Sequence, residues 1–262
     1  MIYASFFLTQ YDFFLPYHLY MSKICCNFAV AFGKNNKFME LQPVAFARNG
    51  FTDKFGIPRQ VREHSRLLTR IVFCPEYRSE DAIRGIEAFS HLWLLWGFHT
   101  VPETSHPSLT VRPPRLGGNV RMGVFATRSP FRPNPIGLTS VRLIEVEHTA
   151  QGPVLVVEGA DMLDGTPIYD IKPYLGYCDS HPDARDGFVD TTPRTLLTVV
   201  WPEPVPKGCP REELEEILSQ DPRPAYQHDP QRIYGLDYSG WNIRFRVEDT
   251  SLYILDIHKI RH

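Results

Sequence analysis

Short apolar runs separated by turn-forming residues dominate the chain from about residue 40 to residue 175. Runs of this length, bounded by Pro, Gly, Asn and Asp, are typical of strands rather than of helices. Many short strands joined by tight turns predict a barrel or a sandwich. We expect strands over Leu41–Arg48, Leu67–Phe73, Leu92–His99, Val120–Thr127, Leu138–Glu147, Val154–Gly159 and Ile168–Ile171.

One stretch in this region is almost wholly apolar, from Leu92 to Phe98, and it contains two tryptophans. Such a run predicts a strand that is buried on both faces. A helix is expected before it, over Glu80–Ala88, because Ser79 can cap the first turn and acidic residues follow directly.

A second, smaller unit is predicted after a segment rich in Asp, Pro and Gly. It should hold a helix with Pro210 at its first position and a buried face made of Leu214, Ile217 and Leu218. Strands are expected over Leu196–Trp201, Trp241–Val247 and Leu252–Ile257. The patterning therefore predicts a β domain at 40–180 and a small α+β domain at 194–262.

Residues 1–38 are rich in Phe and Tyr but keep neither a period of 2 nor a period of 3.6. They lack the basic start and clean apolar core of a signal peptide. We expect this segment to be a leader outside the fold, with the ordinary domain beginning near Met39.

Composition narrows the class of protein further. Apolar residues make up 43% and charged residues 22% of the 262 residues, and the net charge is −2, as in soluble globular proteins. The five cysteines are odd in number and no pair has C-x-x-C spacing, so neither a disulfide framework nor a metal site is expected. Reduced thiols favour a cytoplasmic protein. The chain contains no run of 18 or more apolar residues, so no membrane span is expected.

The segment from Val111 to Arg142 has an unusual charge pattern, because it contains arginines but no Asp, Glu or Lys. A guanidinium matches phosphate and carboxylate better than an ammonium does. The segment could be a solvated surface, or it could bind nucleic-acid phosphates or a small anion. Its arginines are Arg112, Arg115, Arg121, Arg128, Arg132 and Arg142.

The same segment is stiffened by Pro130, Pro133 and Pro135, which flank Arg132 and Asn134. It is either a pre-organised binding loop or a proline-rich connector. The chain has no G-x-x-x-x-G-K-[ST] and no G-x-G-x-x-G between a strand and a helix, so a P-loop or a doubly wound nucleotide fold is not supported.

Four strings resemble the signature of the TsaA-like (TrmO-type) family: IPRQ from Ile57, AIRGIEAFSHLWLLWGFH from Ala82, TVRPPRLGGNVRMGVFATRSPFRPNPIGL from Thr110 and DMLDGTPIYDIKPYL from Asp161. QDPRPAY from Gln220 is similar to the C-terminal extension of its bacterial members. The resemblance implies a mainly β fold, a single-sheeted closed β-barrel, that works as a homodimer. It also implies an enzyme that uses S-adenosylmethionine to methylate the 6-amino nitrogen of N6-threonylcarbamoyladenosine, next to the anticodon of tRNA.

The resemblance also implies site residues. The methionine carboxylate of the cofactor would need an arginine, and its hydroxyl and amino groups would need acceptors such as Asp161 and Asp164. Thr100 stands where the family often has Gln. The implied cofactor set is Pro58, Arg59, Gln60, His99, Thr100, Arg128, Leu138, Asp161, Asp164, Gly165 and Thr166.

Substrate residues follow from the two remaining motifs. Asp221 and Tyr226 of QDPRPAY are the catalytic candidates, although its prolines could simply end the preceding helix. The candidates for contact with tRNA are Arg112, Arg115, Arg121, Arg132, Asn134 and Arg223. A non-catalytic RNA- or nucleotide-binding β-barrel and a methyltransferase with another small substrate remain alternatives. The QDPRPAY string favours tRNA over the latter.

Overall fold

The computed structural model describes residues 40–58, 65–102, 108–189, 196–224, 227 and 229–260. The expected leader, residues 1–38, lies outside this part of the chain. Gln42–His262 belong to one compact unit. Across the described residues, no helix is both long and apolar enough to cross a membrane.

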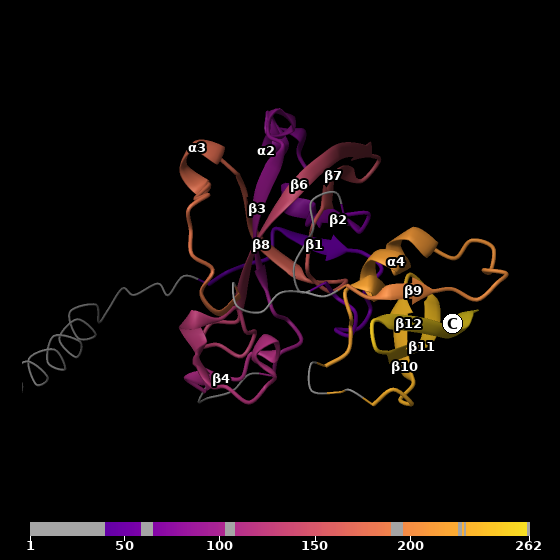
Figure 1. The fold of residues 1–262 in the computed structure, drawn as a ribbon. Helices are drawn as coiled ribbons and strands as arrows, with labels where there is room; N and C mark the ends of the chain where they lie inside the picture. Colours follow the sequence, from indigo (N-terminus) through magenta and orange to yellow (C-terminus); the bar gives the residue numbers. More distant parts are fainter. Residues whose placement is uncertain are drawn as a thin grey trace, which may run out of the picture. The chain divides into compact units, whose positions relative to one another are not determined.

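The larger part of the chain is a closed antiparallel barrel, which confirms the predicted fold class (Figure 1). Around the barrel the strands follow the order β1-β2-β7-β6-β3-β8, and β1 pairs with β8 to close it. The strands are β1 (Ala45–Arg48), β2 (Leu68–Phe73), β3 (His91–Gly97), β6 (Ile136–Thr149), β7 (Gly152–Glu158) and β8 (Pro167–Pro173).

Alternate side chains of β1, β2, β3 and β7 point into the barrel and fill its interior. Leu92, Leu94 and Trp96 of β3 point inward together with Ile71 of β2 and Leu155 of β7. The intervening Trp93 and Leu95 are only partly buried, so the prediction that β3 is buried on both faces was wrong. An apolar run does not reveal that a closed barrel leaves its outer face open to solvent.

The helix expected over Glu80–Ala88 is broken in two. Ser79 caps α2 (Glu80–Ile83) as predicted, with its side chain accepting a hydrogen bond from the Asp81 amide. Gly85 then takes a left-handed φ of 86°, and a 3-10 turn, η2 (Ile86–Ala88), follows. The left-handed glycine ends the helix, as it does at many helix C-termini.

The prediction of a strand over Val120–Thr127 was also wrong. Only β5 (Met122–Gly123) is extended there, paired with β4 (Thr110–Val111), and the 3-10 turn η4 (Val124–Ala126) follows. Val120 and Phe125 are 48% and 77% exposed, so this apolar run contributes little to a core. The remaining short helical segments of this part are η1 (Pro75–Tyr77), η3 (Pro114–Leu116), α3 (Gly176–Asp179) and η5 (Gly187–Val189).

The C-terminal part is a four-stranded sheet with one helix. Its strand order is β10-β11-β12-β9, with β9 parallel to β12. Leu214, Ile217 and Leu218 of the helix are buried as predicted, but Pro210 is its N-cap rather than its first residue. The elements are β9 (Thr198–Val200), α4 (Arg211–Ser219), β10 (Tyr234–Tyr238), β11 (Trp241–Glu248) and β12 (Ser251–Lys259). No strand was predicted at β10, although its buried and more exposed side chains alternate as in a half-buried strand.

The segment that follows β1 joins the two cores. Phe51 is buried in the core of the C-terminal sheet, and its ring lies 5.0 Å from that of Tyr238. Gly50 accepts a hydrogen bond from the Ser239 amide, and a side chain at Gly50 would collide with Ser239 and Tyr238. The end of β1 is therefore fixed both to the barrel and to the C-terminal core.

Candidate functional site

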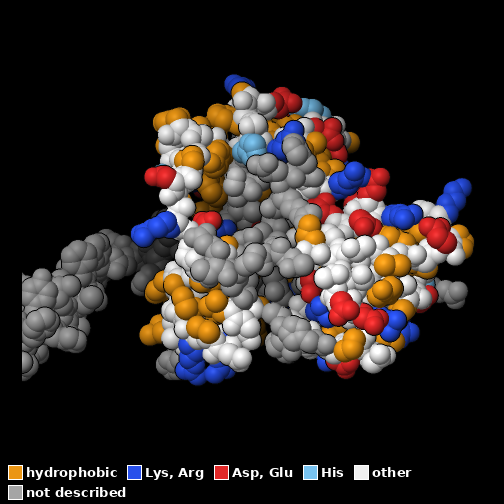
Figure 2. Space-filling view, viewed as in Figure 1, with side chains coloured by type: hydrophobic (Ala, Val, Ile, Leu, Met, Phe, Trp, Pro, Cys, Tyr) orange, Lys and Arg blue, Asp and Glu red, His pale blue; other side chains and the backbone are white. Residues whose placement is uncertain are grey.

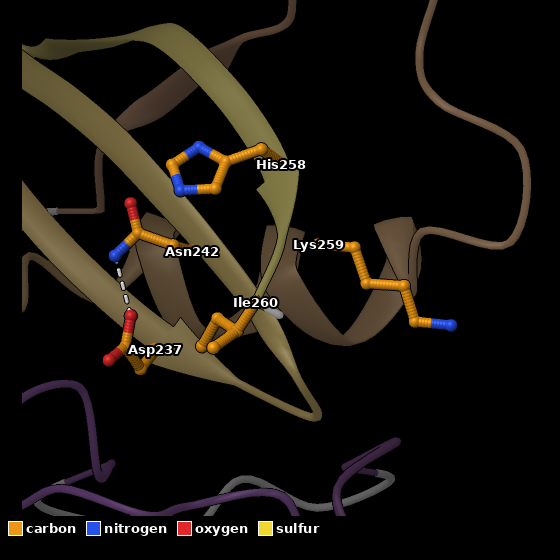
Figure 3. A pocket seen from close by; sticks show the side chains of 5 residues that line it. All are labelled: Asp237, Asn242, His258, Lys259 and Ile260. Atoms are coloured by element: carbon orange, nitrogen blue, oxygen red, sulfur yellow. Dashed lines mark hydrogen bonds between the residues drawn. The ribbon is translucent and has the colours of Figure 1, made fainter. Parts of the chain in front are cut away.

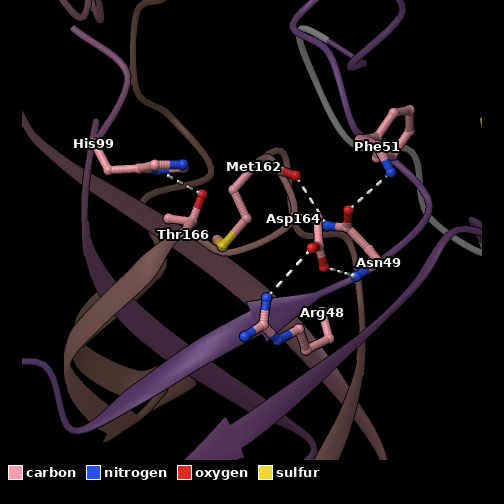
Figure 4. Close-up of polar contacts among 7 residues, drawn as sticks. All are labelled: Arg48, Asn49, Phe51, His99, Met162, Asp164 and Thr166. Carbon is pink, nitrogen blue, oxygen red and sulfur yellow. Dashed lines mark hydrogen bonds and ion pairs between the residues drawn. The ribbon is translucent and has the colours of Figure 1, made fainter. Parts of the chain in front are cut away.

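The turn between β7 and β8, residues 161–166, is tied to the end of β1 by Asn49 (Figure 4). The Asn49 amide N–H donates to Asp164 Oδ1 at 3.0 Å, and its side-chain Nδ2 donates to the Met162 carbonyl at 2.9 Å. Asn49 Oδ1 accepts from the Phe51 amide at 3.0 Å. Asn49 thus joins the end of β1 to the turn at residues 161–166 through both its backbone amide and its side chain.

Asp164 completes this corner through a second contact with β1. Its Oδ2 lies 3.3 Å from Arg48 Nη1, and both side chains remain partly exposed. The Gly165 amide donates to the Ala47 carbonyl at 2.9 Å, and Gly165 has a φ of 76°, which favours glycine. The predicted residues Asp164 and Gly165 therefore sit in a turn with a fixed backbone and an accessible carboxylate.

His99 and Thr166, which the resemblance implies from two separate strings, come together at the same end of the barrel. The Thr166 hydroxyl lies 3.5 Å from His99 Nδ1 (Figure 4). Thr166 is buried, whereas His99 and the neighbouring Thr100 are exposed, and the Thr100 carbonyl accepts from Lys54 Nζ at 3.2 Å. The exposed imidazole is available to a ligand.

Asp161 lies in a hydrogen-bonded chain that begins inside the barrel. Trp96 Nε1 donates to Thr139 Oγ1 at 3.0 Å, and Thr139 Oγ1 donates to Asp161 Oδ1 at 2.7 Å. Burial raises the pKa of Asp161 above its ordinary value, while the Thr139 hydrogen bond and the charge of Arg128 partly counteract that rise.

Arg128 and Arg132 flank the proline-rich loop but differ in their surroundings. Arg128 is exposed, and its charge acts on the carboxylate of Asp161. Arg132 is half-buried and donates from Nη1 to the Thr127 carbonyl at 3.2 Å. Arg132 therefore has a structural contact within the loop, although it was predicted to bind tRNA.

The segment around β4 and β5 presents a surface of mixed character. Arg112 and Arg121 are exposed, and the exposed apolar side chains include Leu109 (70%), Phe125 (77%) and Phe131 (57%). Figure 2 shows basic side chains beside hydrophobic ones on the part of the molecule that contains β4. Arg142 differs from these arginines, because Glu158 lies 3.5 Å from it. Exposed apolar groups mixed with cations are typical of interaction surfaces.

Asp221, a catalytic candidate, is engaged by Arg223. Arg223 Nε donates to Asp221 Oδ1 at 2.8 Å, and Nη2 donates to Oδ2 at 2.9 Å. The hydrogen bond and the charge of Asp221 raise the pKa of Arg223. Both oxygens of the Asp221 carboxylate are therefore held by the two-pronged guanidinium.

The remaining predicted residues are scattered or undescribed. Leu138 is 56% exposed on β6, directly before Thr139, while Pro58 is buried and Asn134 is exposed. Arg59, Gln60 and Tyr226 lie outside the described residues, as does the side chain of Arg115.

Four residues of this region were not identified from the sequence: Arg48, Asn49, Trp96 and Thr139. The Asn49-Gly50 pair after a predicted strand was a turn signal. Nothing in the sequence links Thr139 to Asp161, because they meet only when β6 and the connection from β7 are placed side by side.

A pocket on the C-terminal sheet is separate from these residues (Figure 3). It is lined by Asp237, Asn242, His258, Lys259 and Ile260, and Asn242 donates to Asp237. Within the described part of the chain, no group of three or more His, Cys, Asp or Glu side chains could hold a metal ion.

Comparison with known proteins extends over both parts of the chain. A family model described as the tRNA-methyltransferase O N-terminal domain matches residues 46–180, and one described as the TrmO C-terminal domain matches residues 208–260. The chain is 40% identical over 222 residues to a tRNA (adenine(37)-N6)-methyltransferase of Escherichia coli K12, covering 80% of this chain and 94% of that protein.

Two further similarities support the same grouping. A protein of the same description from Eikenella corrodens is 48% identical over 165 residues, which cover 62% of this chain and 92% of that protein. The crystal structure of TrmO from Pseudomonas aeruginosa superposes with a TM-score of 0.69 at 31% identity, covering 86% of this chain and 100% of that chain.

Proposed function

The chain belongs to the tRNA-methyltransferase O family, and we propose that it methylates the 6-amino nitrogen of N6-threonylcarbamoyladenosine beside the tRNA anticodon, with S-adenosylmethionine as methyl donor. The observation that carries this proposal is the match of both domains, in order, on a closed barrel of the family's type.

The described residues fit the chemistry of the donor. When bound, S-adenosylmethionine supplies an electrophilic methyl group on a positively charged sulfur. Its carboxylate calls for an arginine, for which Arg128 is accessible and Arg59 is a further candidate from the motif. Its hydroxyl and amino groups call for acceptors, and Asp164 offers a partly exposed carboxylate in a turn that Asn49 holds in place.

The rest of the predicted cofactor set stays part of the proposal. His99 and Thr166 lie together at the same end of the barrel, and the neighbouring positions Pro58, Gln60, Thr100, Leu138 and Gly165 belong to the motifs that resemble the family. Their individual contributions are best separated by affinity measurements on single variants.

The substrate surface is proposed to lie around β4 and β5. Exposed arginines can neutralise tRNA phosphates, and exposed aromatic rings can stack on unpaired bases of a loop. The same apolar side chains, among them Phe125 at 77% exposure, support a homodimer in which part of this surface is covered by a second copy. Because the proposed substrate is tRNA, we also propose that the protein is located in the cytoplasm.

Methyl transfer by the purified protein tests the function directly. Labelled S-adenosylmethionine is supplied with tRNA that carries threonylcarbamoyladenosine, or with the same tRNA lacking that group, and the nucleosides are resolved by mass spectrometry. We expect one added methyl group on the modified adenosine alone. Cofactor and tRNA binding without any methylated product would favour the non-catalytic RNA-binding barrel instead.

A further inference from the structure

The chain of hydrogen bonds from Trp96 through Thr139 to Asp161 ends at the turn proposed to hold the cofactor. Thr139 accepts from Trp96 at 3.0 Å, so its own proton must point to another acceptor, which is Asp161 Oδ1 at 2.7 Å. A hydroxyl whose lone pair and proton are both assigned has one orientation. The Asp161 carboxylate is thereby fixed in direction.

Packing holds the first member of this chain in place. Trp96 is 5% exposed, lies over the backbone of Gly137, and has the ring of Phe98 4.4 Å away. A β-carbon at Gly137 would collide with the indole ring, so glycine is required beside it. The indole cannot move without losing the hydrogen bond to Thr139, which makes the anchor rigid.

The surroundings of Asp161 combine low hydration with one nearby cation. The groups that act on its carboxylate are the Thr139 hydroxyl on β6, the backbone amide of Asp161 itself and the charge of Arg128 from the loop before β6. Hydrogen bonding and the charge of Arg128 favour the ionised form, whereas burial favours the protonated form. Burial is the largest of these effects, so the pKa of Asp161 is raised above its ordinary value, and its carboxylate accepts a proton more readily than an exposed aspartate does.

We propose that Asp161 is the proton acceptor in methyl transfer and that Thr139, anchored by Trp96, is the residue that positions it. This inference rests on the proposed function. The nitrogen lone pair forms the new N–CH3 bond, the S–CH3 bond breaks with its electron pair returning to sulfur, and the N–H proton passes to Asp161. The reacting nitrogen carries a carbamoyl group and an adenine ring, which delocalise its lone pair, so proton loss must accompany transfer.

The alternative acceptor from the sequence is less suited to this role. Asp221 accepts two hydrogen bonds from the Arg223 guanidinium, at 2.8 and 2.9 Å. Protonating it would break a charge-assisted pair. The side-chain hydrogen bond that Asp161 Oδ1 accepts comes instead from the neutral hydroxyl of Thr139, so protonation there breaks no charge-assisted pair with a guanidinium.

Three variants test the assignment in the full chain: Asp161→Asn, Thr139→Val and Thr139→Ser. Asp161→Asn keeps the shape and an oxygen for the Thr139 hydroxyl but cannot take up the proton. We expect its single-turnover methylation rate to fall about 100-fold. Because Asp161 also belongs to the predicted cofactor set, its calorimetric affinity for S-adenosylmethionine is measured in parallel and should fall by less than about tenfold, far less than the rate.

The Thr139 variants test positioning through the pKa of Asp161, which should not change if Thr139 only stabilised the fold. In the protein without cofactor, the titration of the Asp161 carboxyl is followed by carbon-13 NMR. Losing the Thr139 hydrogen bond in Thr139→Val should raise the pKa of Asp161 and shift the acidic limb of the rate profile to higher pH. Thr139→Ser should restore both. Asp164→Asn is the matched control, expected to weaken cofactor binding without shifting the limb.

Two outcomes would overturn the inference while leaving the proposed function intact. Asp161→Asn could methylate tRNA within about threefold of wild type, or its rate loss could be matched by an equal loss of cofactor affinity. Wild-type protein that produces no methylated nucleoside would instead reject the proposed function itself, so the two failures are distinguishable.

Discussion

The guanidinium of Arg223 holds the carboxylate of Asp221 with two hydrogen bonds, from Nε to Oδ1 at 2.8 Å and from Nη2 to Oδ2 at 2.9 Å. The Arg223 side chain is only 10% exposed, and Asp221 has a left-handed φ of 51°. This pair fixes the chain just after α4, where the QDPRPAY string begins. It gives Asp221 a structural role.

Asp221→Asn should therefore destabilise the protein more than it slows the chemistry. An amide offers the Arg223 charge a weaker acceptor, and we expect a loss of about 1–3 kcal/mol in the free energy of unfolding. Urea denaturation measures the stability and single-turnover methylation measures the rate. An unchanged unfolding midpoint combined with a 100-fold slower reaction would return Asp221 to a catalytic role.

Asn49→Ala should weaken both stability and cofactor affinity. The change removes the side-chain hydrogen bonds to Met162 and Phe51, which should cost about 2 kcal/mol, and it frees the turn that carries Asp164. We expect calorimetry to show about tenfold weaker binding of S-adenosylmethionine. Asn242→Ala is the control, because that asparagine bonds to Asp237 on the C-terminal sheet. Equal cofactor affinity in both variants would contradict a role for Asn49 in the turn.

The regular parts of the fold were accessible from the sequence because they depend on local pattern. The strands ending at Phe73 and including Leu155 are short apolar runs between turn residues, and they fall where expected. The run Val120–Thr127 has the same pattern, yet Phe125 points to solvent. An exposed apolar run cannot be told from a core strand by periodicity alone.

The residues of the candidate site also fall into those that the sequence could indicate and those that it could not. Asp161, Asp164 and Thr166 were identified because they stand within a recognisable string. Thr139 and Asn49 were not, since their partners lie 22 and 115 residues away and only barrel closure brings them together. The prediction that Arg132 contacts tRNA was made without its hydrogen bond to the Thr127 carbonyl, which the sequence does not show.

Tyr238 should make the stability of the protein fall in alkaline solution. Burial is the main cause that raises its pKa to about 12, from an ordinary value of 10. The folded state thus holds the phenol proton more tightly than the unfolded state does, so this stabilisation is complete below pH 10 and is lost as the pH rises from 10 to 12. The loss should be about 2–3 kcal/mol.

Tyr238→Phe separates this effect from the titration of other groups. The variant should lose the part of the pH dependence between pH 10 and 12 that wild type shows in urea denaturation. Tyr77→Phe serves as the control, because Tyr77 is 41% exposed. Parallel stability curves for wild type and Tyr238→Phe over this range would show that the phenol ionises without opposing the fold.

Arg112 and Arg121 should contact tRNA phosphates, whereas Arg132 should not. The first two are exposed beside β4 and β5, and Arg132 is half-buried with a hydrogen bond to the Thr127 carbonyl. Each phosphate contact releases counterions, so Arg112→Ala and Arg121→Ala should each flatten the dependence of log affinity on log salt by about one unit. Arg132→Ala should leave the slope unchanged and lower the melting temperature. Wild-type slopes for both exposed variants would place the phosphate contacts elsewhere, and Arg232 and Arg244 on the C-terminal part would be tested next.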